Sequence, residues 1–407
     1  MREEFYCCLA FSHFLGIGPV RFKALVESFG SAKRAYQAQK DELAKVVGEN
    51  LAQKFIRFRE EFDPLKKEEE LRKKEITVIP FYSNLYPASL KNISDPPICL
   101  YVRGDANIFS NFSSFLIEAR HHDFSPTSPP QSGGSPKSLA QNQVSSPLEN
   151  FSTSSFCKLF FAIVGTRKPT PYGEQVAKKF ARELAQAGFV IVSGMAMGID
   201  TTAHWGAIEV GGKTIAVLGC GVDIIYPAIN RGLYEKIVNG AGAVISEFPP
   251  GQMVAKGLFV ARNRIISGLS DGVLVVEGAE DSGALITARY AGEQGKEVFA
   301  APGPLTSQMS AAPNILIKKG AKLVTSVEDI YEELDVKILP KKKEKVAKDL
   351  SLEEKMIFEI LAKEPMIIDE LAVKIRQPIT QILNIVSLLE VKGVIEKNRE
   401  GKYQVRI

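Results

Sequence analysis

Two short segments of this chain combine arginine with small residues in a way that suits phosphate binding. The first, Gly165-Thr166-Arg167, follows an apolar run at residues 160–164 and precedes a helical pattern. A glycine at a strand-to-helix turn lets the backbone approach a ligand, and the first N–H groups of a helix attract anions. Arginine adds a planar fork that grips phosphate oxygens through two bonds. We therefore predict a phosphate-binding turn at Gly165, Thr166 and Arg167.

The second segment, Arg262-Asn263-Arg264, opens another helical pattern further along the chain. Residues i and i+2 of a helix do not share a face, so one arginine can point at a ligand while the other pairs with an internal carboxylate. A merely solvated basic start of a helix is the weaker interpretation, because arginine there opposes the helix dipole. Phe259 lies just before the arginines, and an aromatic ring beside cations suits single-stranded nucleic acid. Which arginine contacts the ligand is left open.

Two further glycine-containing segments are expected at the same crevice. Gly194 and Gly198 follow one apolar run, where their backbone amides could face a ligand. Ser282 and Gly283 follow another, where they could donate hydrogen bonds to a phosphate. Asp200 is about as well explained as the N-cap of a helix as by ligand contact.

Catalysis has some support from three carboxylates near the ends of apolar runs, Asp200, Glu247 and Glu277. Glu247 and Glu277 are equally candidates for pairing with a crevice arginine. The one histidine in these segments, His204, falls one turn into a helix, where a packing role is the commoner one. No Ser–His–Asp order, nucleophile elbow or metal-ligand spacing is present. We therefore expect a binding protein rather than an enzyme, with no cofactor and no metal.

Two apparent nucleotide motifs fail on inspection. Gly211-Gly212-Lys213-Thr214 lacks the required glycine five positions before Gly212, since Ala207 stands there, and it leads from a helix into a strand. Gly219-Cys220-Gly221 lacks the third glycine of a dinucleotide fingerprint. Neither nucleoside triphosphate hydrolysis nor a nicotinamide cofactor is expected.

The elements that must position these residues follow from the apolar pattern. Continuous apolar runs separated by amphipathic helices predict an α/β fold, an extended Rossmann-like domain with a mainly parallel sheet covered on both faces. Ligands of such a sheet lie at the carboxyl ends of its strands. The predicted strands span residues 160–164, 190–193, 214–218, 243–246, 273–276 and 298–301.

The remaining regions predict separate modules. Residues 1–75 form a helical module in which a Gly16-Ile17-Gly18 turn either contacts a nucleic-acid backbone, as in a helix-hairpin-helix, or only permits close packing. Residues 76–335 form the α/β domain. Within it, residues 106–155 are rich in Ser, Pro, Asn and Gln, which predicts a mostly disordered insertion with a short helix near 112–119.

A basic linker at 336–350 and a winged helix at 351–407 complete the chain. Its recognition helix carries little positive charge, which slightly favours protein interaction over duplex DNA binding.

Composition narrows the class of protein without naming a ligand. The chain has 407 residues, 45% hydrophobic and 24% charged, with a net charge of +4. These values are typical of a globular protein and only weakly favour nucleic acid. Five cysteines form no CxxC pair, which favours reduced thiols. No run approaches membrane-spanning length, so we expect a cytoplasmic protein with no membrane insertion.

Taken together, these motifs resemble the DprA/Smf family, the DNA-processing proteins of bacterial natural transformation. The segments that carry the resemblance are GIG at 16–18, LYVRG at 100–104, IVGTR at 163–167, SGMAMGIDTTAH at 193–204, LGCGVDIIYP at 218–227, SEFPPG at 246–251, RNRIISGLS at 262–270, SGALITA at 282–288 and APG at 301–303. The resemblance implies a homodimer that binds single-stranded DNA through Arg167 and loads the recombinase RecA, without enzymatic turnover. Val260 and Ala312 replace a proline and a glycine of the family pattern.

Two rival functions remain. Related Rossmann-like folds include nucleotide phosphoribohydrolases, in which Glu277 would be the catalytic carboxylate. Their PGGxGT-type loop does not match residues 277–287, which argues against this alternative. The other is a structural adaptor that works through the winged helix and has no affinity for single-stranded DNA.

Overall fold

The computed structural model describes residues 2–110, 117–119, 158–338, 350–361, 364–392, 394–398 and 401–405. Contacts divide the chain into two compact units, Met1–Ile338 and Leu339–Ile407. The two units are described separately below.

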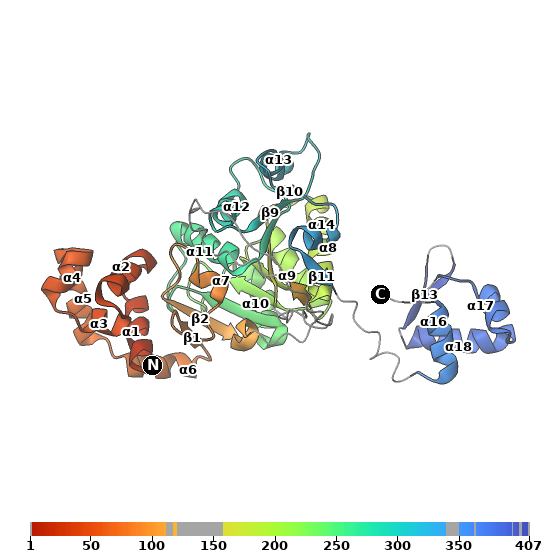
Figure 1. The fold of residues 1–407 in the computed structure, drawn as a ribbon, viewed down its shortest axis with the longest axis horizontal. Helices are drawn as coiled ribbons and strands as arrows, with labels where there is room; N and C mark the ends of the chain where they lie inside the picture. The colour runs from red at the N-terminus through yellow and green to blue at the C-terminus, as the bar shows by residue number, and fades with distance from the viewer. Residues whose placement is uncertain are drawn as a thin grey trace, which may run out of the picture. The chain divides into compact units, whose positions relative to one another are not determined.

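A nine-stranded sheet organises the first unit (Figure 1). Its order is β1-β2-β7-β6-β5-β4-β8-β9-β10. β2 runs antiparallel to both of its neighbours, β1 and β7, and every other neighbouring pair is parallel. The strands are β1 (Thr77–Pro80), β2 (Cys99–Gly104), β4 (Phe160–Val164), β5 (Val190–Ser193), β6 (Thr214–Val217), β7 (Gly242–Ser246), β8 (Gly272–Val275), β9 (Glu297–Ala300) and β10 (Lys322–Leu323). Each of the six predicted parallel strands is present within one residue of its predicted bounds, so the α/β class with a mainly parallel sheet is confirmed.

The strand order places a switch point beside β4. From β4 the chain adds β5, β6 and β7 on one side, and then returns to add β8, β9 and β10 on the other. In open α/β sheets the loops diverge at such a point and leave a crevice at the carboxyl ends of the strands. The ends of β4 and β8 therefore frame the expected ligand site.

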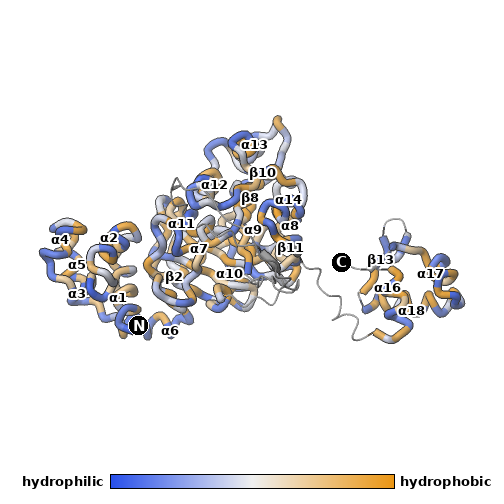
Figure 2. Tube along the Cα trace, in the orientation of Figure 1, coloured by the Kyte–Doolittle hydropathy of each residue, from blue (hydrophilic) through white to orange (hydrophobic). Residues whose placement is uncertain are grey.

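Helices cover both faces of this sheet, which explains why its strands are apolar throughout. Ala162 and Val164 of β4 pack in one cluster with residues of α11 and α12, whereas Phe161 and Ile163 pack in the other with α8 and α9. Alternate side chains of a strand point to opposite faces, so a strand covered twice has no polar face. Figure 2 gives the hydropathy of each residue along the chain trace. These and the other helices of the α/β region are α7 (Ala88–Lys91), α8 (Pro171–Ala187), α9 (Ile199–Glu209), α10 (Arg231–Lys236), α11 (Lys256–Leu269), α12 (Gly283–Glu293), α13 (Ala311–Lys318) and α14 (Glu328–Glu333).

The N-terminal residues form six helices, whose buried side chains share one core with residues of β2. They are α1 (Arg2–His13), α2 (Pro19–Phe29), α3 (Ala32–Gln37), α4 (Lys40–Val47), α5 (Glu49–Glu61) and α6 (Pro64–Lys73). The same core includes Tyr101 of β2, whose hydroxyl lies 2.6 Å from Ser12 Oγ of α1. A side chain at Gly16 would come within 2.7 Å of Leu51 Cδ1, so close packing explains this glycine. A nucleic-acid role for the turn stays a prediction.

The predicted insertion at 106–155 is wrong at both places where the structure describes it. Ala106–Phe109 form a short 3-10 helix whose Ile108 and Phe109 are buried in the sheet's core. Ile117–Ala119 form β3 rather than a helix, paired antiparallel with β11 (Val336–Ile338). That pairing also shows that residues 336–338, predicted as the start of the basic linker, form a strand. Composition missed both elements because their stability comes from distant partners. Residues 111–116 and 120–155 of the insertion and residues 339–349 of the linker lie outside the described ranges.

In the second unit, the described residues form three helices and one antiparallel strand pair. They are α16 (Leu352–Leu361), α17 (Ile368–Ile375), α18 (Ile379–Val391), β12 (Ile395–Lys397) and β13 (Tyr403–Val405). This element order is the predicted one, and the winged-helix assignment stays a prediction. α18 contains no lysine or arginine. Across the described part of the chain, no helix combines the length and the apolar character needed to span a membrane.

Candidate nucleic-acid interface

A cavity of about 930 Å³ lies at the carboxyl ends of the strands, beside the switch point. Three segments from different parts of the sequence line most of it: residues 164–168, 254–263 and 279–287. Eight of the predicted site residues line this crevice: Gly165, Thr166, Arg167, Phe259, Arg262, Asn263, Ser282 and Gly283. Gly194, Gly198 and Arg264 do not, and each has a structural function instead.

The turn after β4 is held by backbone contacts rather than by a helix terminus. Thr166 N–H donates to Glu277 O at 2.7 Å. A side chain at Gly165 would come within 2.6 Å of Ile199 Cγ1 and 2.9 Å of Glu277 O, so only glycine fits. Arg167, the next residue but one, is exposed at the rim of the crevice. The sequence therefore identified the turn correctly.

The carboxylate of Glu277 occupies the N-terminus of α8, so the expectation that this terminus binds an anionic ligand is wrong. Glu277 is buried, and its two carboxylate oxygens accept from Thr170 N at 2.8 Å and Thr170 Oγ1 at 2.6 Å. Thr170 Oγ1 in turn accepts from Gly173 N at 3.3 Å. A carboxylate at a helix N-terminus complements the helix dipole. Glu277 is thus a structural cap, and its partner is Thr170 rather than an arginine.

Of the two α11 arginines, Arg264 is the one that pairs with internal carboxylates. Its Nη1 and Nη2 donate to Glu247 Oε1 at 2.9 Å and Oε2 at 2.7 Å, and its Nε donates to Asp95 Oδ2 at 2.7 Å. The Arg264 side chain is only 4% exposed. The guanidinium therefore joins α11 to the loop after β7 and to the segment before β2. The prediction that Arg264 lines the ligand site is wrong.

Arg262 lines the crevice but is buried, with its Nη1 directed at the backbone. Nη1 donates to Gly194 O at 2.7 Å and also to Val217 O, so the side chain links the ends of β5 and β6. A side chain at Gly194 would lie 2.6 Å from the guanidinium carbon. Gly194 is therefore needed to make room for Arg262, rather than to present an amide to a ligand.

Asp200 completes this buried layer of the crevice. Its Oδ2 accepts from Gly194 N at 3.1 Å and Ala196 N at 3.3 Å, which ties the loop after β5 to the first turn of α9. Burial raises the pKa of the Asp200 carboxyl, and the neighbouring Arg262 guanidinium opposes that rise. Asp200 lies inside the first turn of α9, whose N-cap is Gly198, so the predicted N-cap function is wrong. Asp200 lines the cavity, and a contact with the ligand stays a prediction.

Gly198 packs against the backbone of the turn that carries Arg167. Its φ of +82° lies in the left-handed region, where a side chain is unfavourable. A side chain there would also come within 2.4 Å of Thr166 O. The close approach lets Ile199 N–H donate to Thr166 O at 3.2 Å. Gly198 therefore shapes the site without lining it.

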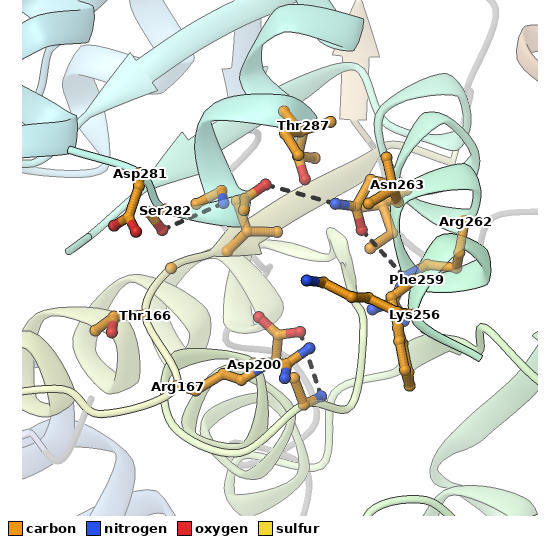
Figure 3. Close-up of a pocket in the computed structure, with 18 of the residues that line it drawn as sticks. Thr166, Arg167, Asp200, Lys256, Phe259, Arg262, Asn263, Asp281, Ser282 and Thr287 are labelled. Carbon is orange, nitrogen blue, oxygen red and sulfur yellow. Dashed lines mark hydrogen bonds between the residues drawn. The ribbon is translucent and has the colours of Figure 1, made fainter. Parts of the chain in front are cut away.

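The exposed positive charge of the crevice comes from Arg167, Lys168 and Lys256. The Arg167 guanidinium lies 5.6 Å from the centre of the Phe259 ring, and the Tyr226 ring lies 5.5 Å from the same ring. Figure 3 shows Arg167 and Lys256 pointing into the cavity from opposite sides. Lys256 was missed, although its place three residues before Phe259 in one helical pattern was a usable signal.

α12 presents its first turn to the cavity opposite Arg167. Ser282 is its N-cap, with Oγ accepting from Ala284 N at 3.3 Å. Asn263 Nδ2 reaches Gly283 O at 3.5 Å and so joins α11 to this turn (Figure 3). An N-terminus of this kind favours anions, although Asp281 beside it has the opposite effect.

His204 has a packing function, as its position predicts. It is fully buried, and its Nδ1 lies 2.6 Å from Thr214 Oγ1. Thr214 Oγ1 donates to Ile191 O, so His204 Nδ1 must be the donor to Thr214. Burial lowers the pKa of His204 to about 3, and the positive charge of Arg262 adds to this effect. Within the described ranges, no cluster of histidine, cysteine and carboxylate side chains could hold a metal ion.

Known proteins are similar to this chain in sequence and in fold. Residues 152–335 match the family model described as DNA recombination-mediator protein A. The DNA processing protein DprA of Bacillus subtilis is 39% identical over 263 residues, which cover 65% of this chain and 73% of that protein. Protein Smf of Synechocystis is 35% identical over 328 residues, 80% of this chain and 71% of that protein. The X-ray structure of DNA processing protein A from Streptococcus pneumoniae matches with a TM-score of 0.63 at 30% identity, covering 82% of this chain and 98% of that one.

Proposed function

This chain belongs to the DprA/Smf family of DNA-processing proteins, and on that premise we propose that its crevice binds single-stranded DNA without chemically altering it. The observation that carries the proposal is the Arg167 guanidinium over the Phe259 ring, with Lys256 across the same cavity. Cations beside an aromatic face bind a backbone phosphate and a stacked base together. An unpaired strand offers both, whereas a duplex keeps its bases stacked inside.

The carboxylates near the crevice support binding rather than turnover. Both oxygens of Glu277 are engaged by Thr170, so this residue is poorly placed to act as the base of a phosphoribohydrolase. Asp200 Oδ2 is held by two backbone amides, and His204 is buried away from the cavity lining. A general base must reach the proton that it removes.

The wider role in the proposal follows the family. The protein would act in the cytoplasm as a homodimer, protect incoming single strands during natural transformation, and load RecA onto them. The family model's description as a recombination mediator supports this role. Loading requires the strand to be held first, so it should fail together with strand binding.

The test is a titration of full-length protein with fluorescein-labelled oligothymidine at two or more salt concentrations. Arg167→Ala should weaken binding about tenfold and reduce the slope of log K against log salt by about 1, as expected for one lost phosphate contact. RecA-dependent strand exchange should fall in parallel.

Arg57→Ala is the matched control, because Arg57 is an exposed arginine of α5 that does not line the crevice. Its affinity and salt slope should equal those of the parent protein. Equal affinity of Arg167→Ala and Arg57→Ala would overturn the assignment of the crevice.

A further inference from the structure

The wall of the crevice at the start of α12 differs in charge from the wall that carries Arg167. Asp281, the residue before the N-cap Ser282, is exposed and lines the cavity. Arg167 and Lys256 line the same cavity as exposed cations. Figure 3 shows Asp281 and Ser282 in the upper part of the view and Arg167 in the lower part. A carboxylate repels a phosphate, so the backbone of a bound strand should lie along the cations and its bases toward α12.

The Asp281 carboxylate is free to accept hydrogen bonds from a ligand. The first turn of α12 is capped by Ser282, whose Oγ accepts from Ala284 N at 3.3 Å, and not by Asp281. Among the residues that the structure describes, Asp281 makes no ion pair and no hydrogen bond. An ionised carboxylate accepts hydrogen bonds and cannot donate them. Asp281 therefore presents the crevice with an acceptor of fixed kind.

Two further polar side chains at this wall can donate. Thr287 is only 2% exposed, and its hydroxyl has no hydrogen-bond partner in the described part of the chain, although the side chain lines the cavity (Figure 3). Asn263 Oδ1 accepts from Arg262 Nε at 3.2 Å, which fixes the orientation of the amide and turns Nδ2 toward Gly283 of α12. A buried hydroxyl without a partner costs free energy, which an acceptor on a ligand would recover.

From this free acceptor beside two donors, we propose that the α12 wall reads the edge of an unstacked base and favours cytosine over thymine. Cytosine carries an amine donor at C4 next to the acceptors N3 and O2, whereas thymine carries the acceptor O4 in place of the amine. Asp281 accepts from the cytosine amine and repels thymine O4, while Asn263 and Thr287 donate to the other acceptors. The inference rests on the proposed binding of a single strand and adds base selectivity to it.

The test compares oligodeoxycytidine, oligothymidine and oligodeoxyuridine of equal length, each labelled with fluorescein. Their anisotropy is followed with full-length protein in a mildly alkaline buffer, which keeps cytosine neutral. Oligodeoxycytidine should bind about fivefold more tightly than oligothymidine, the low end of what one good base contact contributes. Oligodeoxyuridine has O4 but no methyl group, so it should bind as oligothymidine does.

Asp281→Asn keeps the size of the side chain, removes its charge and adds an amide that can donate to O4. The ratio of cytidine to thymidine affinity should therefore fall to about 1. Glu280→Gln, an exposed neighbour that does not line the crevice, is the matched control and should keep the ratio of the parent protein. Thr287→Val should weaken oligodeoxycytidine about threefold without changing the salt slope, since no charge is removed.

Arg167→Ala separates this inference from the proposed function, because it should weaken all three oligonucleotides by the same factor. Failure of the parent protein to bind any of them would overturn both proposals. Base selectivity alone would be overturned by equal parent affinities for oligodeoxycytidine and oligothymidine, or by the same ratio in Asp281→Asn and Glu280→Gln. Oligodeoxyuridine bound as tightly as oligodeoxycytidine would also overturn it, since the methyl group would then explain the difference.

Discussion

The turn after β4 and helix α11 both carry arginine, but the fold uses this side chain in opposite ways. Arg167 is exposed and stacks on Phe259, whereas Arg262 and Arg264 are 5% and 4% exposed. The two buried arginines connect four segments at the carboxyl end of the parallel strands, through contacts with Gly194, Val217, Glu247 and Asp95. An arginine motif in sequence therefore indicates a crevice, and only the environment of each guanidinium distinguishes ligand binding from structural support.

The largest effect that would test this contrast is on stability. Arg264→Ala should lower the free energy of unfolding by about 3–5 kcal/mol, because Glu247 would stay buried without its cation. Urea denaturation followed by circular dichroism measures the change. The double variant Arg264→Met/Glu247→Leu should recover much of the loss, since no buried charge remains. A loss below about 1 kcal/mol in the single variant, the level of an exposed pair, would show that Arg264 is not an internal brace.

A smaller effect, on both stability and oligothymidine binding, is expected at Arg262. Arg262→Ala should cost about 2–3 kcal/mol of stability, because two buried carbonyl oxygens lose their donor. Oligothymidine should bind more weakly, but with an unchanged salt slope, because this guanidinium faces the protein and not a phosphate. Gly194→Ala should produce the same pair of changes, since its side chain would displace Arg262. A salt slope reduced as in Arg167→Ala would instead place Arg262 on the strand.

The smallest effect is expected at Lys256, an exposed lysine that lines the same crevice as Arg167. Lys256→Ala should weaken oligothymidine binding roughly threefold through one lost phosphate contact. Its unfolding free energy should change by less than about 0.5 kcal/mol, as for most exposed positions. Lys236→Ala, an exposed lysine of α10 outside the cavity, is the control. A stability loss in Lys256→Ala larger than that in Arg262→Ala would reverse the contrast drawn here.

Predictions from sequence succeeded where one local pattern decides the structure. The apolar runs identified six strands, and the turn at Gly165 was located because a strand ended there. Predictions failed where a partner far away in sequence decides: the 3-10 helix at Ala106–Phe109 is stabilised by burial of Ile108 and Phe109, and β3 by pairing with β11. Gly194 and Gly198 were recognised as important but assigned the wrong function, since the space around a glycine is invisible in sequence.

The sequence by itself indicated the family through the resemblance of its motifs. It also determined the α/β class and the segments that meet at the crevice, because hydrophobic periodicity and turn residues act over a few neighbouring positions. The tertiary structure decided which side chains are free there. In the folded protein Glu277 accepts hydrogen bonds from Thr170, and Arg264 pairs with Glu247 and Asp95. Arg262 donates to backbone carbonyl oxygens. Arg167 and Lys256 have no such internal partner among these groups and face the cavity. The physical reason is that a charged group buried in folding must find a partner, and those partners come from remote parts of the chain.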